Sequence, residues 1–257
     1  MKKIYFAALA LALTACVSNE DLNPVDNYGY IDVNVSNDPV MVTRAEGDLD
    51  VSDLSNWTII ATKGQTTTYY DHQNKYIKVS EGDYTVTASN YENADKALEA
   101  NNGLGDAYYE GSATCKVQPG STASVKIECG QAKNSRIKLI SSLDDAFSNV
   151  KLNTLGDRAK SLSPNDVMYF NINEGGTTIS YNITYTHNRA GDVTLPQNNS
   201  FTLTLEQPAY EYQIKLSSNT NGIITVTVTR NETFTESEAN VLEFDAATGQ
   251  EVVKQNS

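Results

Sequence analysis

Histidine and tryptophan are scarce in this sequence, with two histidines and one tryptophan among 257 residues. His72 and His187 lack the His-x-x-x-His spacing of a zinc hydrolase, and no Gly-x-Ser-x-Gly turn accompanies them. Each is better explained as a surface residue than as a ligand. We therefore expect no enzyme activity, no metal and no cofactor, and only paired carboxylates for glycoside hydrolysis stay open as an alternative.

Positive charge is also scarce, because 19 Lys and Arg residues face 32 Asp and Glu residues, giving a formal net charge of −13. Binding to nucleic acid draws its affinity from Lys and Arg that neutralise phosphates, so we expect no nucleic-acid partner. The densest acidic cluster, Glu46, Asp48, Asp50 and Asp53, lacks the Asp-x-Asp-x-Asp-Gly spacing of a calcium loop. A solvated loop is the simpler interpretation.

Long hydrophobic runs are missing except at the N-terminus. Lys2 and Lys3 precede an apolar stretch at residues 4–13 that is too short for a resident membrane helix. Residues 1–15 therefore read as an export signal. The sequence Leu-Thr-Ala-Cys that ends at Cys16 resembles a bacterial lipobox, in which the thiol of the cysteine is acylated after cleavage. The alternative is an ordinary secretory peptide with an incidental cysteine.

This resemblance implies a palmitate-type lipid anchor at Cys16 and a place in the outer membrane. Residues 16–27 are polar and acidic and read as a flexible tether. Glu20 and Asp21 resemble the signal that sends lipoproteins of gut anaerobes to the cell surface. A merely solvated linker remains the alternative.

From residue 28 onward, apolar and polar residues alternate, which is typical of half-buried β-strands. Thr, Val, Ile and Tyr fill these runs, and Gly, Asn and Pro turns separate them. The single expected helix covers residues 93–100. The strands are expected at residues 30–35, 84–88, 124–129, 136–140, 167–172, 179–185, 201–205, 212–216 and 223–228.

Many short strands at this spacing predict an all-β protein with two tandem antiparallel β-sandwiches. Two expected hairpins, 112–129 around a Pro-Gly turn and 210–228 around an Asn-Gly turn, each close one half. We place the sandwiches at residues 28–132 and 133–232. Residues 233–257 form an acidic segment with a possible strand pair at 241–244 and 252–253.

Two thiols remain after Cys16. Cys115 and Cys129 fall on the same alternation phase and point into one core, where they are either buried free thiols or, if directly opposite, a disulfide.

The order of motifs in the first half points to a family. Residues 29–33, 42–45, 50–54, 81–88, 107–112 and 117–120 together resemble the fimbrillin-like surface lipoproteins of gut anaerobes, in a branch of uncharacterised function. This resemblance covers about residues 28–135. It implies two transthyretin-like β-sandwiches and a role in adhesion or in pili.

In the polymerising members, cleavage at an arginine opens a groove that a strand of a neighbouring subunit fills. Arg44 is the one position here that matches. The alternative is an uncut arginine in the loop of a non-polymerising adhesin. Strand addition to other fimbrillin-like subunits is physically reasonable in both cases.

Tyrosine is abundant, with 15 residues. Trp57, Tyr69, Tyr70, Tyr108 and Tyr109 are candidates for a platform that binds host or dietary glycans, although Tyr is also common at half-exposed strand positions. The sequence thus favours a non-catalytic, lipid-anchored surface protein, a fimbrillin-like adhesin or pilus-related structural subunit. The alternative function is a glycan-binding lipoprotein of a polysaccharide uptake system.

Overall fold

The computed structural model describes residues 27–36, 52–232, 235–236 and 240–252. Cys16, the tether at 16–27 except its last residue, and Arg44 lie outside the described residues, as do Glu46, Asp48 and Asp50. Among the described residues, no helix is long and apolar enough to cross a membrane.

The first half folds into a three-stranded and a four-stranded sheet. Across the three-stranded sheet, the order is β4 (Ile77–Ser80), β1 (Tyr28–Ser36) and β7 (Thr122–Glu128). Across the four-stranded sheet, the order is β3 (Thr66–Tyr69), β2 (Thr58–Lys63), β5 (Gly82–Ser89) and β6 (Glu110–Val117). We call these seven strands the first sandwich.

The second half, which we call the second sandwich, also has two sheets. One runs in the order β11 (Val167–Asn171), β8 (Asn134–Ser142), β15 (Glu211–Ser218), β16 (Ile223–Glu232) and β17 (Thr235–Glu236), and β18 (Asn240–Asp245) also pairs with β16. The other runs in the order β10 (Ser161–Leu162), β9 (Phe147–Thr154), β12 (Thr177–His187) and β13 (Gly191–Leu195), and β14 (Phe201–Leu205) also pairs with β12.

Both sandwiches share one strand order. The sheet β4-β1-β7 corresponds to β11-β8-β15, and β3-β2-β5-β6 corresponds to β10-β9-β12-β14. In each, the first strand pairs antiparallel with one neighbour and parallel with the other, as β1 does with β7 and β8 with β15. The second sandwich adds β13 and the extension from β16 to β18.

The alternation seen in the sequence produces the two cores. In β1, Ile31, Val33 and Val35 are buried and the residues between them are exposed. One core contains buried residues from Ile31 to Cys129, and the other contains residues from Ile137 to Ala246. Phe244 of β18 is packed into the second core. This core therefore extends past residue 232, the predicted end of the second sandwich.

The all-β fold is confirmed, and the pairing corrects two expectations of detail. Each sandwich has one parallel pair among its antiparallel ones. The expected hairpin at residues 112–129 is also wrong, because β6 pairs with β5 and β7 pairs with β1. The chain crosses from one sheet to the other at the Pro-Gly turn. The hairpin β15–β16 around the Asn-Gly turn is confirmed.

Three helical segments occur in the described part of the chain: η1 (Leu54–Asn56), α1 (Ala94–Gly103) and η2 (Gly156–Arg158). The expected helix is α1, whose N-cap is Asn93. The Asn93 side chain accepts a hydrogen bond from the amide of Lys96 at 2.9 Å.

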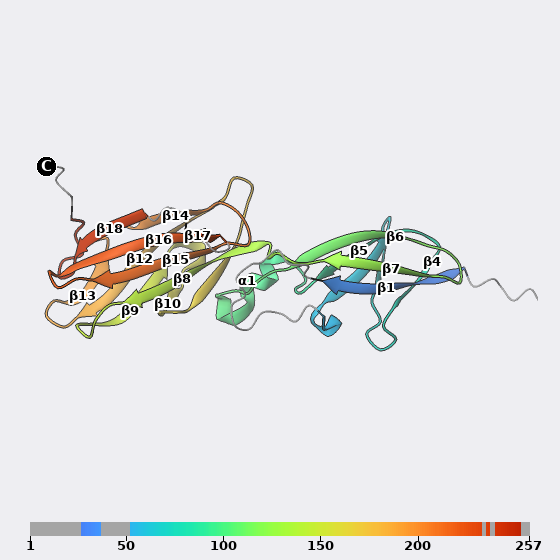
Figure 1. Ribbon diagram of the computed structural model, residues 1–257, viewed down its shortest axis with the longest axis horizontal. Coiled ribbons are helices and arrows are strands. Elements are labelled where there is room, and N and C mark those ends of the chain that lie inside the picture. The colour runs from blue at the N-terminus through green and yellow to red at the C-terminus, as the bar shows by residue number, and fades with distance from the viewer. Residues whose placement is uncertain (1–26, 37–51, 233–234, 237–239, 253–257) are drawn as a thin grey trace, which may run out of the picture.

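The two sandwiches lie end to end, with α1 between them (Figure 1). The guanidinium of Arg158 donates hydrogen bonds to the carbonyl oxygens of Leu98 (3.1 Å), Gly103 (2.8 Å) and Tyr169 (2.7 Å). The amide of Tyr169 in turn donates to the carbonyl of Leu104 at 2.8 Å. Arg158 thus ties the helix of the first half to strand β11 of the second.

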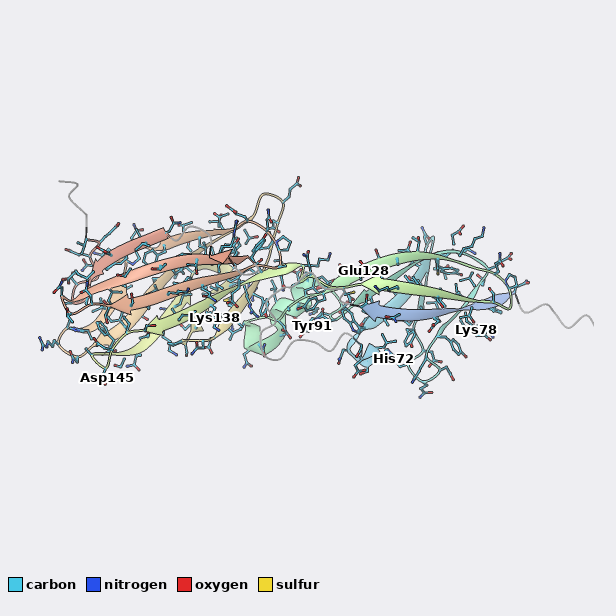
Figure 2. All side chains as sticks on the ribbon, viewed as in Figure 1. His72, Lys78, Tyr91, Glu128, Lys138 and Asp145 are labelled. Carbon is cyan, nitrogen blue, oxygen red and sulfur yellow. The ribbon has the colours of Figure 1, made fainter. Side chains whose placement is uncertain are left out.

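Tyr91, labelled in Figure 2 beside α1, adds a second polar contact at this junction. Its hydroxyl donates to a carboxylate oxygen of Asp106 at 2.9 Å. Burial, together with the hydrogen bond and the charge of Asp106, raises the pKa of Tyr91 to about 12. The hydroxyl therefore keeps its proton, and this bond, across the physiological pH range.

We expect Arg158→Ala to loosen the junction, because three carbonyl oxygens lose a charged donor, each such bond being worth about 1.5–3 kcal/mol. Hydrogen exchange at the Tyr169 amide should become faster. Arg189→Ala is the matched control, since Arg189 is exposed on the turn between β12 and β13. Equal exchange rates at Tyr169 in the two variants would show that Arg158 does not hold the halves together.

Candidate functional site

Strand β1 is the candidate functional element, because it lies in the middle of its sheet while being the first strand of the fold. It pairs antiparallel with β4, from Tyr28 opposite Ser80 to Ile31 opposite Ile77. On its other side it pairs parallel with β7, from Tyr30 opposite Thr122 to Ser36 opposite Glu128. No described pairing joins β4 to β7, so these two strands are held in one sheet only by β1.

The inner face of β1 completes the first core. Ile31, Val33 and Val35 are each at most 5% exposed. They pack in one cluster with Ile77 of β4 and Ile127 of β7. Full burial of such side chains stabilises a fold by about 1.5–3 kcal/mol each. Removal of β1 would uncover this apolar surface and two rows of backbone donors and acceptors.

The chain around β1 shows how the strand is connected. The amide of Cys129 donates to the carbonyl of Ser36 at 2.8 Å, which fixes the end of β1 to the end of β7. Residues 37–51, which include Arg44, follow β1, and the description resumes at Ser52 just before η1. One covalent connection therefore joins β1 to the rest of the fold, and Arg44 is within it.

The five aromatic residues proposed as a glycan platform do not form one exposed face. Trp57 is 2% exposed, Tyr70 7% and Tyr108 6%, whereas Tyr69 is 69% exposed. Trp57 belongs to the same core as β1, in the alternation phase of Ile59 and Ala61. The alternation of Trp57, Ile59 and Ala61 is visible in the sequence and indicates that the side chain of Trp57 faces the core.

Tyr108 and Tyr109 lie near the junction of the two sandwiches. The amide of Tyr108 donates to the side-chain oxygen of Asn134 at 3.1 Å, and its hydroxyl donates to Glu110 at 3.1 Å. Burial, followed by the charge of Glu110, raises the pKa of Tyr108 to about 12. The amide of Tyr109 donates to the side chain of Asn90 at 2.7 Å. These contacts give both residues a structural role at the junction.

Cys115 and Cys129 are free thiols in the structure. Cys115 lies on β6 opposite Tyr84 of β5, whereas Cys129 directly follows β7, so they occupy different sheets. Burial raises the pKa of both thiols, that of Cys129 to about 11. A raised pKa keeps a thiol protonated and unreactive.

The histidines do not gather other ligands. His72 packs edge-on against the ring of Tyr70, and His187 lies against Phe147. Within the described ranges, no cluster of three or more His, Cys, Asp or Glu side chains could hold a metal ion.

Both halves of the fold are included in a known sequence family. Residues 28–242 match the family described as Domain of unknown function (DUF4493). The chain belongs to this family. The match begins with β1 and ends within β18, so it spans both sandwiches of the DUF4493 protein. No curated protein matches the sequence.

Several solved structures are similar in outline. A candidate cell adhesion protein of Bacteroides uniformis has 9% identity and a TM-score of 0.40, over 80% of this chain and 99% of that one. A fimbrial assembly protein of Parabacteroides distasonis has 11% identity and a TM-score of 0.32, over 71% and 81% of the two chains. A candidate adhesin of Bacteroides ovatus has 12% identity and a TM-score of 0.34, over 82% and 96%. Because these scores are low, the fold assignment rests on the sheets described above.

We expect Trp57→Ala to reduce the free energy of unfolding by about 3–5 kcal/mol, because it leaves a large cavity in the first core. Tyr69→Ala should change it by less than about 0.5 kcal/mol, since its side chain is exposed. Urea denaturation measures both. A Trp57→Ala protein as stable as the parent would contradict the burial of Trp57. Glycan binding is better tested with Tyr69→Ala, because this change removes an exposed ring and leaves the core intact.

We also expect two free thiols in the folded protein carrying Cys16→Ser. Iodoacetamide at pH 8 should label Cys129 slowly. A thiol whose pKa is about 11 is only about 0.1% thiolate at that pH, and the thiolate is the form that reacts. Labelling should accelerate about tenfold per pH unit up to the pKa and become complete on unfolding. Mass spectrometry counts the labels. An unlabelled, unfolded chain that gains two labels only after reduction would reveal a disulfide instead.

Proposed function

We propose that this DUF4493 protein is a non-catalytic cell-surface lipoprotein, a fimbrillin-like adhesin or pilus-related structural subunit. Acylated Cys16 anchors it to the outer membrane, and the two sandwiches project from residues 16–27. The sequence at Cys16 and the order of motifs in the first half support this proposal. So does the position of β1.

The placement of β1 is the observation that carries the proposal. The strand nearest the proposed anchor lies in the middle of a sheet, so the first core depends on it. Here β1 directly follows the tether and pairs on both sides. Cleavage at Arg44 would leave β1 attached to the membrane and separate it covalently from the body of the protein.

The consequence of such cleavage follows from the burial of β1. Departure of the strand exposes the apolar partners of Ile31, Val33 and Val35 and leaves β4 and β7 unpaired along their facing edges. An extended segment with apolar residues at alternate positions fits that slot, because it restores both ladders and the core. A second subunit can supply this segment. Without cleavage, the same protein stays anchored as a single adhesin.

The burial of Trp57, Tyr70 and Tyr108 removes most of the proposed glycan surface. No other observation in the described residues favours a glycan-uptake role, so we do not develop that alternative.

The proposal predicts two N-termini for protein recovered from intact cells. Anchored molecules should begin at acylated Cys16, and molecules processed for assembly should begin at Ala45. Arg44→Ala should abolish the second form and any surface polymer, while Arg189→Ala, which changes an exposed arginine in the second sandwich, should alter neither. Mass spectrometry and electron microscopy of the cell surface provide the readouts.

Cys16→Ser tests the anchor separately. This variant should be released from the membrane fraction, since its acyl chains are lost. A Cys16→Ser protein that still partitions with membranes would refute the lipoprotein proposal. Polymers that persist in Arg44→Ala cells would refute the role of Arg44 and leave the anchored adhesin as the function.

A further inference from the structure

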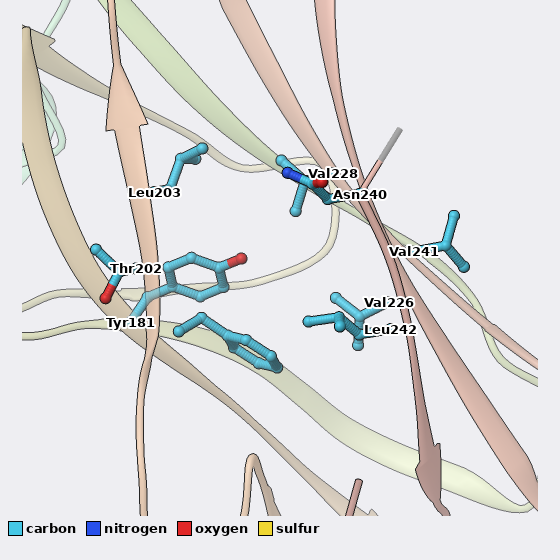
Figure 3. Close-up of a pocket in the computed structure, with 9 residues that line it drawn as sticks. Tyr181, Thr202, Leu203, Val226, Val228, Asn240, Val241 and Leu242 are labelled. Atoms are coloured by element: carbon cyan, nitrogen blue, oxygen red, sulfur yellow. The ribbon is translucent and has the colours of Figure 1, made fainter. Parts of the chain in front are cut away.

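The second sandwich has a cleft where its two sheets come apart. The cleft lies between β14 and β18, the edge strands of the two sheets, and has a volume of about 210 Å³. Tyr181 and Phe201 line one side, and Val226 and Leu242 line the other. Figure 3 shows the ring of Tyr181 directed into this space, opposite β16 and β18. We call it the seam cleft.

Two leucines, Leu242 and Leu203, are incompletely covered at the seam cleft. Leu242 of β18 lies opposite Val226 of β16, and opposite residues in a ladder share a face. Val226 is 1% exposed, yet Leu242 is 37% exposed. On β14, Phe201 and Leu205 are buried, and Leu203 between them on the same face is only half-buried.

The first sandwich shows how such a seam can close. Its edge strands β6 and β7 approach each other so closely that a Cβ at Gly111 would collide with the carbonyl oxygen of Glu128. In the described part of the second sandwich, the seam cleft lies between the edge strands β14 and β18.

The chain itself turns back toward the seam cleft after β18. The Asp245 carboxylate accepts hydrogen bonds from the amides of Ala247 (3.1 Å) and Thr248 (2.8 Å), which stabilise a turn. The amide of Asp245 then donates to the carbonyl of Gln250 at 2.9 Å, and the amide of Val252 donates to the carbonyl of Glu243 at 2.8 Å. Residues 250–252 therefore run antiparallel to β18 along its free edge.

The turn also places this segment next to the second sheet. The amide of Gln197 donates to the carbonyl of Gly249 at 3.0 Å. A Cβ at Gly249 would collide with the carbonyl oxygen of Thr194 at the end of β13. The segment after Gly249 thus enters the seam between β18 on one side and the chain leading to β14 on the other.

The register of this pairing sets where the next residues would lie. Phe244 is opposite Glu251, so an extension of this pairing would put residues 253, 254 and 255 opposite Leu242, Val241 and Asn240. The backbone N–H and C=O of Val241 point away from β16, and no described residue pairs with them. Val253 would share a face with Leu242. Three extended residues cover about 10 Å, the length of this open edge.

We propose that the seam cleft is a strand-binding site whose occupant is the chain's own residues 253–255, which extend the β18 turn and place Val253 over Leu242 and Leu203. This strand closes the edge that the fold otherwise leaves open, including the exposed side chain of Val241, which is 52% accessible. The proposal depends on neither the lipid anchor nor Arg44. A strand from a second copy is the competing occupant.

Disulfide trapping tests the register directly in the full chain carrying Cys16→Ser. Leu242 and Val253 would form a non-hydrogen-bonded pair, whose Cα atoms are about 4.5 Å apart, within the range for a disulfide. Leu242→Cys with Val253→Cys should form an intramolecular bond. Leu242→Cys with Lys254→Cys is the matched control, because residue 254 points to the opposite face. We expect the first pair to oxidise at least about tenfold faster.

Each result decides the question. Equal oxidation rates for the two pairs would overturn the proposal. They would show that positions 253 and 254 reach position 242 equally often, as in a segment with no fixed pairing to β18. A bond between two chains would overturn it in favour of a second copy as the occupant. Hydrogen exchange gives a readout without engineered cysteines: deletion of residues 253–257 should accelerate exchange at the Val241 amide and leave that of Leu242, which pairs with β16, unchanged.

Discussion

The fold depends on one repeated interaction, the parallel pairing of the first strand of each sandwich with a strand distant in sequence. β1 pairs with β7 although residues 37–121 lie between them, and β8 pairs with β15 although residues 143–210 lie between them. In both cases the first strand also pairs antiparallel with the fourth strand of its half. Each three-stranded unit is therefore held by its first strand. The difference between the halves is that β8 follows directly from the first sandwich, whereas β1 follows the tether.

This difference gives β1 its candidate role. β8 is fixed at its first residues by the ion pair between Arg136 and Glu211, 2.6 Å apart and largely buried, and by the junction around Asn134. β1 has comparable apolar burial but no buried ion pair among the described contacts. A strand held by backbone pairing and apolar packing can be replaced by another of the same pattern, because neither interaction depends on unique side chains.

The sequence predicted the local structure well, because alternation is a local signal. It located β1, β5, β7, β8, β11, β12, β14, β15 and β16, the helix α1 and the hairpin β15–β16. It missed β2, β3, β4, β9, β10 and β13, several of which are short. It did not predict the parallel pairs, since a strand's pattern says which face is buried and nothing about its partner. The proposed hairpin at 112–129 failed for this reason: the Pro-Gly turn was compatible with pairing or with a crossing between sheets. Trp57 was a candidate for the glycan platform because it is aromatic, whereas its phase with Ile59 and Ala61 indicates the core position that the structure shows. Arg158 gave no signal, because its partners are backbone carbonyls distant in sequence.

The two seams show how small local differences decide whether a sandwich edge is open. In the first sandwich, Gly111 lets β6 approach the backbone of Glu128, so the corner closes without another strand. In the second, the sheet continues from β15 through β16 to β18, so the strand facing β14 is no longer the counterpart of β7. The seam cleft lies between this extension and β14, and it leaves Leu242 exposed and Leu203 only half-buried. β16 and β18 therefore leave an apolar edge that one further strand could cover. The turn at Asp245 directs the chain toward this edge.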